Sequence, residues 1–318
     1  YKKGKSNNVG ILNPRTSLKL FETVLAHNHE DIEINDKDLE ILIFKIYLAL
    51  NEQLNKNDKL IGESVKQFSQ YPEYICLIIG ISLPTSDISN YNLKSVFIGQ
   101  VLKAIFLFEF LSEQDSAKRL LESFYKRFKV TDYKGFLQKI LPLAVFVISA
   151  QKEGAITLKV NSDENYKSNI DFLDQLTVNS IDYTDNDIDY LTLRANPLYK
   201  VDDISYRVIS PLFAIEKIFN GLYFLLKEIN DAFDEAYQIN LRQLITFGFS
   251  EKYLLYKIIE RTYKKKYFKL AGEQMKTPGA PDYYIRNGNK VFLIESKDIF
   301  IKADIKESYD FEKYEKAL

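Results

Sequence analysis

Apolar residues recur at intervals of three and four through the first half of the chain, which is the spacing of a helix with one buried side. The clearest run begins behind Asp36, a residue type suited to a helix N-cap, and consists of Leu39, Leu42, Ile43, Ile46, Tyr47 and Leu50. The same spacing occupies Leu60–Phe68, Leu93–Leu111, Ser116–Lys129 and Tyr133–Ser149. The pattern therefore predicts a helical region that ends near residue 150.

The pattern changes after Gly154. Ala155–Val160 has the composition of a strand and is followed by an acidic stretch that runs to residue 189. Leu198–Val201 and Ile204–Val208 flank an Asp-Asp turn and predict a hairpin. Helical spacing returns over Pro211–Tyr237.

The C-terminal segment combines a helix with a second hairpin. We expect a helix from Glu251 to about Lys265 with Ser250 as its N-cap. Strands over Asp282–Ile285 and Lys290–Ile294 surround Asn287-Gly288, a strong hairpin signal because both turn positions need positive φ. A last helix begins near Tyr309.

These elements predict an α+β chain with three domains. The first, 1–153, is helical; the second, 154–249, is a connecting region of acidic loop, hairpin and helix; and the third, 250–318, is a smaller α/β core of helix, strands with a hairpin, and helix. The last helix stops in the middle of its pattern, so we expect this core to continue beyond Leu318.

Charge and cysteine content exclude several classes of protein. Lys and Arg (43) nearly balance Asp and Glu (44), so no global positive field draws the chain to nucleic acid, and any such surface must be local. Cys76 is the single cysteine, which excludes an internal disulfide and a cysteine-rich zinc site and suits a reducing compartment. We therefore expect a cytoplasmic protein.

The apolar runs predict no membrane anchor. The run Ile140–Ala150 is too short to cross a bilayer. The longer run Val96–Leu111 is interrupted by Gln100, Lys103 and Glu109.

The residues that carry chemistry lie around the second hairpin. Pro281-Asp282 is followed, after twelve residues, by Glu295-Ser296-Lys297. Side chains alternate along a strand, so Glu295 and Lys297 share one face and Ser296 points away. In a hairpin that turns at Asn287-Gly288, Asp282 pairs close to residue 293 or 294, within reach of Glu295.

Two converging carboxylates repel each other unless a cation lies between them, and Mg²⁺ prefers such oxygen ligands. The apolar run before Glu295 indicates a buried strand, where an unpaired carboxylate would be costly. The ordinary alternative is that Glu-x-Lys is a surface ion pair on an exposed hairpin.

This arrangement resembles the PD-(D/E)xK superfamily of restriction-endonuclease-like nucleases over residues 250–318. The resemblance implies a restriction-endonuclease-like core that hydrolyses phosphodiester bonds with Mg²⁺ or Mn²⁺ held by Asp282 and Glu295. It implies a further ligand in the backbone carbonyl of Ser296. It also implies that Lys297 orients the attacking water or neutralises charge on the phosphate.

Members of this superfamily often add an acid from the preceding helix. Glu251 and Glu260 are the candidates, and Glu251 is preferred because it opens the predicted helix. The alternative is that Glu251 only complements the helix dipole.

A basic segment precedes the motif and interleaves lysines with Tyr263, Tyr267 and Phe268. Its lysines that are candidates for binding nucleic acid are Lys264, Lys265, Lys266 and Lys269. They have the chemistry to grip phosphates while the rings stack on bases. A solvated basic helix end is the alternative.

The expected function is that of a metal-dependent nuclease, foremost a DNA endonuclease of a bacterial restriction, repair or phage-defence system. The helical region would then select the substrate, a protein partner or an activation state, and cleavage of both strands would favour a homodimer. Two alternatives stay open: an RNase on the same fold, and a binding or scaffold protein in which the nuclease fold has lost catalysis.

Overall fold

The computed structural model describes residues 13–27, 33–65, 88, 91–150, 156–179, 190–276, 278–296, 313 and 316, with side chains in 55–65 left out. The protein is α+β, with helices predominating and two three-stranded antiparallel sheets in the described part of the chain. Contacts divide the chain into two compact units that are each discontinuous in sequence. Unit 1 comprises 1–96, 142–217 and 301–318, and unit 2 comprises 97–141 and 218–300. The three domains expected from the sequence stay a prediction.

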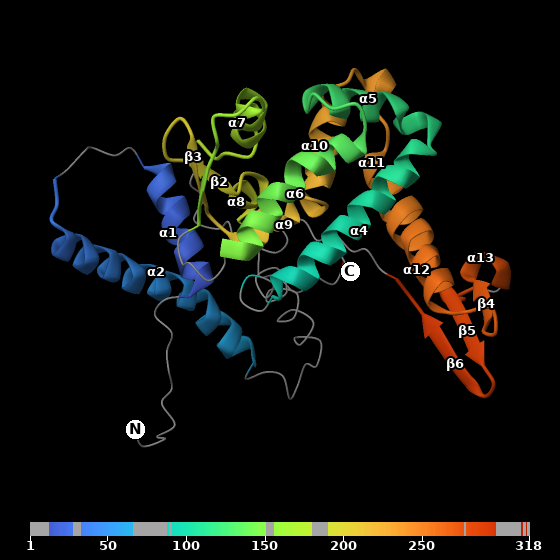
Figure 1. The fold of residues 1–318 in the computed structure, drawn as a ribbon. Coiled ribbons are helices and arrows are strands. Elements are labelled where there is room, and N and C mark those ends of the chain that lie inside the picture. Colours follow the sequence, from blue (N-terminus) through green and yellow to red (C-terminus); the bar gives the residue numbers. More distant parts are fainter. Residues whose placement is uncertain are drawn as a thin grey trace. The chain divides into compact units, whose positions relative to one another are not determined.

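Unit 1 combines the 30-residue helix α2 and several shorter helices with a small sheet (Figure 1). Its helices are α1 (Pro14–Ala26), α2 (Asp36–Val65), α7 (Tyr166–Asp174), α8 (Leu191–Ala195) and α9 (Pro211–Glu216). Its strands are β1 (Thr157–Lys159), β2 (Leu198–Lys200) and β3 (Ser205–Val208), in the order β1-β3-β2. The first predicted strand and the first predicted hairpin are therefore confirmed.

Helix α1 begins as its sequence dictates. The side chain of Asn13 accepts the backbone N–H of Thr16 at 2.9 Å, and Pro14 occupies the first turn, where its missing N–H costs nothing. Tyr190, nearly completely buried, donates its hydroxyl to the carbonyl of Arg15 at 2.9 Å. Buried Leu18 and Phe213 complete the contact of α1 with the core of unit 1.

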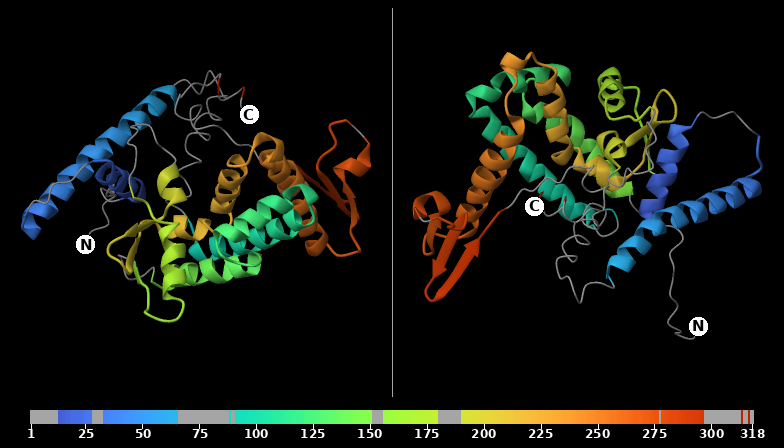
Figure 2. Two further views of the ribbon diagram at one scale, coloured as in Figure 1. Left: turned by 90° about the horizontal axis from the view of Figure 1, so that it is seen from above. Right: turned by 180° about the vertical axis from the view of Figure 1, so that it is seen from behind.

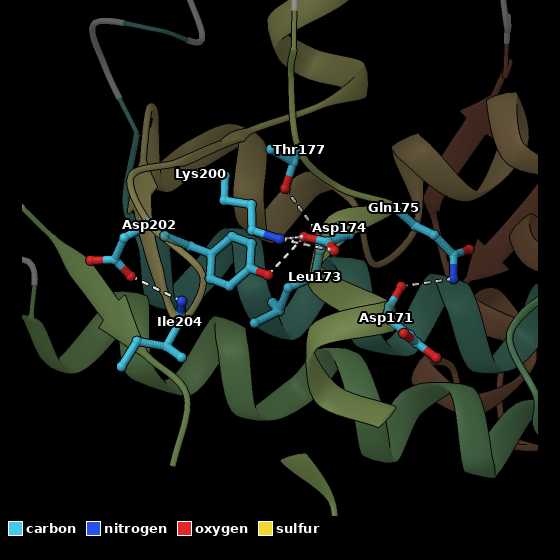
Figure 3. A network of polar contacts seen from close by, with 9 residues as sticks. Asp171, Leu173, Asp174, Gln175, Thr177, Lys200, Asp202 and Ile204 are labelled. Atoms are coloured by element: carbon cyan, nitrogen blue, oxygen red, sulfur yellow. Dashed lines mark hydrogen bonds and ion pairs between the residues drawn. The ribbon is translucent and has the colours of Figure 1, made fainter. Parts of the chain in front are cut away.

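A polar network attaches α7 to the sheet of unit 1 (Figure 3). Asp174, at the end of α7, accepts hydrogen bonds from Lys200 at 2.9 Å and from the hydroxyl of Tyr206 at 2.7 Å. Burial and the neighbouring Asp174 carboxylate raise the pKa of Tyr206, so its proton stays in place. This network links the end of α7 to β2 and β3.

Unit 2 contains most of helix α4, the first half of α6, further helices and the second sheet. Its helices are α4 (Leu93–Ser112), α5 (Lys118–Arg127), α6 (Tyr133–Ala150), α10 (Asn220–Asp231), α11 (Leu241–Gln243), the π-helix Leu244–Leu254, α12 (Leu255–Thr262) and α13 (Gly272–Met275). Short 3₁₀ turns cover Asp115–Ala117 and Glu235–Tyr237. The unit boundaries fall inside α4 and α6.

Helices α4 and α6 are long and apolar enough to cross a membrane, judged by length and composition alone. For both helices this differs from the expectation: the short run Ile140–Ala150 is only part of α6, and α4 meets the criterion although three polar residues interrupt it. The polar residues of α4 make contacts within unit 2. Gln100 accepts the backbone N–H groups of Phe219 and Asn220, and Glu109 pairs with Lys257 at 3.1 Å. Core helices of water-soluble proteins meet the same criterion.

The second sheet follows α12 and contains β4 (Phe268–Ala271), β5 (Tyr283–Asn287) and β6 (Lys290–Ile294), in that order. Helix α12 packs on one face of it, as the views in Figures 1 and 2 agree. Ile259 of α12 and Tyr283 and Ile285 of β5 are buried at this contact. The predicted hairpin is confirmed, whereas β4 was not predicted separately. The helix expected from Tyr309 lies outside the described residues except at positions 313 and 316, which are helical.

Candidate functional site

The turn of the second hairpin lies one residue later than the sequence predicted. Asn287 pairs with Lys290, so the loop is Gly288-Asn289, and only Gly288 has a positive φ, of 60°. A turn with glycine at its first central position satisfies the twist of the strands without a second residue at positive φ. The predicted pairing of Asp282 with residue 293 or 294 is therefore wrong. In the observed register Tyr283 pairs with Ile294 at the end of the ladder, and Asp282 and Glu295 are the residues that follow this last pair on the two sides.

Asp282 and Glu295 meet at the open end of this hairpin. The backbone N–H of Asp282 donates to Oε2 of Glu295 at 3.3 Å. The backbone N–H of Ser296 donates to Oδ2 of Asp282 at 2.6 Å. Asp282 and Ser296 are half-buried and Glu295 is exposed. These two bonds bring the Glu295 carboxylate to the backbone of Asp282, thirteen residues away, and the Asp282 carboxylate to the backbone of Ser296.

The strand that leads to Glu295 is exposed, which overturns the expectation that it is buried. Val291, Phe292 and Leu293 are 48%, 46% and 64% exposed. The reason is topological: β6 is the last strand of the sheet in the described part of the chain, and α12 packs mainly on the face that carries Tyr283 and Ile285. Burial of β6 therefore gives no support to Glu295 as a metal ligand. The support for that role comes from the position of Glu295 beside Asp282.

Lys297, the third residue of the motif, lies outside the described residues. The shared face expected for Glu295 and Lys297 stays a prediction.

Glu251 does not open a helix, so the reason for preferring it was wrong. The helix begins at Leu241, where the side chain of Asn240 accepts the backbone N–H of Gln243 at 3.0 Å. Ser250 and Glu251 lie inside the π-helix. A π-helix places successive side chains differently from an α-helix, so the periodicity of the sequence misassigns their faces.

The surroundings of Tyr256 connect Glu251 with the candidate site. Burial raises the pKa of Tyr256, and the negative charges of Glu273, Asp282 and Glu251 raise it further. Burial is the largest of these causes, and the charges of Asp282 and Glu251 contribute less than that of Glu273. Glu273 itself pairs with Lys252.

Glu260 is engaged elsewhere. Its carboxylate accepts hydrogen bonds from Lys269 of β4 and, at 2.5 Å, from the hydroxyl of Tyr283. The bonds from Lys269 and Tyr283 lower the pKa of Glu260. This carboxylate fastens α12 to the sheet.

The four candidate nucleic-acid lysines separate into two groups. Lys264, Lys265 and Lys266 are exposed in the turn between α12 and β4. Lys269 is held inward by Glu260, its side chain only 13% exposed, and it also donates to the carbonyl of Tyr263. The turn therefore presents three lysines to solvent. Lys269 instead links β4 to α12 through Glu260.

A cavity of about 630 Å³ opens beside this turn. It is lined by Tyr256, Glu260, Lys265, Lys266, Tyr267, Phe268, Lys269, Ala271, Gln274 and Tyr283. The sequence drew attention to the lysines and to two of the rings. It missed Tyr256, Gln274 and Tyr283, which reach the wall only because β4 and β5 pair beneath the end of α12.

Asp282 and Glu295 have the oxygen ligands that a divalent cation needs. Within the described ranges, no three His, Cys, Asp or Glu side chains are grouped to hold a metal. Mg²⁺ often binds through one or two carboxylates and completes its shell with waters and substrate phosphates. Oδ1 of Asp282 accepts no hydrogen bond in the part of the chain that the structure describes. Asp282 and Glu295 thus fit a Mg²⁺ site of this open kind.

Comparison with known proteins gives no relative: no family model, curated protein or solved structure matches this chain. The resemblance to the PD-(D/E)xK superfamily rests on the motif itself.

Proposed function

We propose that this protein is a Mg²⁺-dependent nuclease of the PD-(D/E)xK type, with its active site at the open end of the β5–β6 hairpin. The observation that carries the proposal is a pair of hydrogen bonds at the hairpin end, in which Glu295 accepts the backbone N–H of Asp282 and Asp282 accepts the backbone N–H of Ser296. A motif that occurred by chance in the sequence would have no reason to bring Asp282 and Glu295 together in the folded chain. The half-buried position of Asp282 also concentrates negative charge where water screens it incompletely.

The residues have separate parts in this chemistry. Asp282 and Glu295 would hold the cation, with the carbonyl of Ser296 as a further ligand. A cation bound there supplies polarisation of a phosphodiester oxygen and a lowered pKa for a coordinated water. Lys297 would place an ammonium charge beside the phosphate as negative charge develops on its oxygens. Glu251 would assist as the acid from the helix.

DNA is the substrate that we propose, in a bacterial restriction, repair or defence setting. The exposed lysines of the turn before β4 support a nucleic-acid partner, because they gather positive charge locally in a chain whose net charge is −1. They do not discriminate DNA from RNA, because both polymers share the phosphate.

Contact with a protein partner is proposed for the helical region. Helix α2 exposes Leu39, Ile41, Leu42, Phe44 and Leu48, each between 40% and 48% accessible. Exposed apolar side chains that are close together on one helix can take part in a protein contact.

Cleavage of plasmid DNA, single-stranded DNA and RNA tests the nuclease proposal. The wild-type chain should cleave at least one of them with Mg²⁺ or Mn²⁺ and none in EDTA. Asp282→Asn should slow cleavage about 10²- to 10³-fold, the usual effect of losing a group that stabilises charge in the transition state. The matched control is Asp234→Asn, which alters an exposed carboxylate without a capping hydrogen bond. Equal rates for the two variants would refute the proposal.

A binding or scaffold protein on the same fold is the second candidate. It is favoured by the lack of a three-ligand group among the described side chains. Such a protein would cleave no substrate and would show no Mn²⁺ binding sensitive to substitution of Asp282.

A further inference from the structure

The cavity beside the turn after α12 is built from aromatic rings with a cationic rim. Its volume of about 630 Å³ falls within the range of roughly 300–1,000 Å³ that small-ligand sites occupy. Phe268 is 55% exposed although it lies in a strand. An exposed aromatic ring beside a hollow is a surface on which another planar group can stack.

Each aromatic ring of the wall contacts another ring, either within the wall or, for Tyr267 and Phe268, outside it. Tyr263 and Tyr267 meet edge to face at 5.4 Å between centroids, and Phe268 and Tyr284 at 6.2 Å. Tyr256 and Tyr283 meet in the same way at 5.3 Å beneath them. A wall positioned in advance loses little entropy when a ligand binds.

The charge of the wall is positive. Lys265, Lys266 and Lys269 face Glu260, whose charge is already offset by Lys269. No ion pair to Lys265 or Lys266 is present within the described ranges. Their two ammonium groups thus stand at the rim, where an anionic ligand would enter.

A polar group on the wall is oriented for donation. Oε1 of Gln274 accepts the backbone N–H of Ala271 at 3.0 Å, which fixes the carboxamide. Its Nε2 group is then the donor that the side chain offers to a ligand. The flat rings suit stacking of a heterocyclic base, and the two lysines suit a phosphate. The fixed amide of Gln274 suits an acceptor atom of the base.

We propose that this cavity binds one unpaired nucleotide of a nucleic-acid strand. The inference rests on the proposed nuclease function and names its substrate class as single-stranded or locally unpaired. A base stacked in a duplex has no free face for Phe268, so it must be unstacked to enter a concave pocket. Tyr283 lines the cavity, and Asp282 of the carboxylate pair is the residue before it in the chain.

Binding without catalysis tests this pocket. Fluorescence anisotropy in EDTA would compare labelled oligothymidylate, oligouridylate and a duplex of the same length. We expect either single strand to bind at least tenfold more tightly than the duplex. Phe268→Ala should weaken single-strand binding about 5- to 100-fold, the range for removing one stacking ring. The double variant Lys265→Ala with Lys266→Ala should make the plot of log affinity against log salt concentration less steep. The slope should fall by about 1.4, which is roughly 0.7 for each lost phosphate contact.

Matched controls alter the same residue types elsewhere in unit 2. Phe224→Ala removes a ring that is 47% exposed on α10, and Lys118→Ala with Lys134→Ala removes two exposed lysines. These variants should bind like the wild type. Equal affinity for duplex and single strand, or single-strand binding by Phe268→Ala as tight as that of the wild type, would overturn the proposal that the cavity binds an unpaired nucleotide.

The two proposals, nucleotide binding in the cavity and nuclease activity, can be refuted independently. Tight single-strand binding that is lost in Phe268→Ala, without cleavage under any condition, would support the pocket and refute the nuclease. Metal-dependent cleavage that Phe268→Ala leaves unchanged would refute the pocket and retain the nuclease.

Discussion

Asp282 and Glu295 lie beside each other at the open end of the β5–β6 hairpin, and the backbone N–H of Asp282 donates to Oε2 of Glu295 at 3.3 Å. The hairpin register alone creates this relationship. Any change that moves β4, β5 or the turn should therefore disturb the pair before it disturbs the helices.

The first prediction concerns Gly272, which lies against the backbone before β5. Its N–H donates to the carbonyl of Asp282 at 2.8 Å, and a Cβ at this position would stand 2.7 Å from the carbonyl oxygen of Pro281. Backbone must move to admit a methyl group, so Gly272→Ala should lower the free energy of unfolding by about 1–3 kcal/mol, as overpacking does. It should also weaken Mn²⁺ binding.

Gly99→Ala is the matched control for this substitution. A Cβ at Gly99 meets nothing within 4 Å, and the residue lies inside α4. Alanine there should stabilise the protein by about 0.5–1 kcal/mol because it orders the helix backbone better than glycine. Urea unfolding of both variants gives the comparison, and a Gly272→Ala variant as stable as the wild type would contradict the close approach.

The second prediction concerns the hydroxyl of Tyr283. It donates to Glu260 at 2.5 Å and helps to fasten α12 to β5. Tyr283→Phe should lower the free energy of unfolding by about 1 kcal/mol, because the acceptor is charged but more than half exposed to water. Tyr284→Phe on the neighbouring position should leave stability nearly unchanged. Equal losses in the two variants, measured by urea unfolding, would refute this role of Tyr283.

The third prediction concerns the pH dependence that Glu260 contributes. Hydrogen bonds from Lys269 and Tyr283 lower its pKa below the ordinary value of 4.5. A depressed carboxyl pKa adds stability that is present above the ordinary value and is lost as the pH falls through the folded-state value. The stability advantage of the wild type over Glu260→Gln should thus be full at pH 7 and shrink at pH 3. An advantage of the same size at both pH values would contradict the assignment.

The sequence predicted the elements that depend on local chemistry. Alternating apolar residues around Asn287-Gly288 predicted the second hairpin, and the Asp202-Asp203 turn predicted the first, because turn residues and strand patterns act over a few positions. It also predicted that Asp282 and Glu295 would approach each other.

The register and the helix start could not be predicted from the same signals. Gly288 accepts positive φ at the first or the second turn position, so the sequence fits two registers that differ by one residue in the turn. Ser250 followed by Glu251 has the composition of a helix start, but Asn240 already caps a helix whose π-turns run through both residues. The cavity depends on pairing between β4 and β5, which is not local in sequence.

A calorimetric titration with Mn²⁺ tests most directly whether Asp282 and Glu295 form a cation site. The wild-type chain should bind Mn²⁺ with a heat signal that Asp282→Asn and Glu295→Gln each abolish or weaken at least tenfold. Asp234→Asn should bind like the wild type. The account is contradicted if wild-type protein binds no Mn²⁺, or if all three variants bind it equally well.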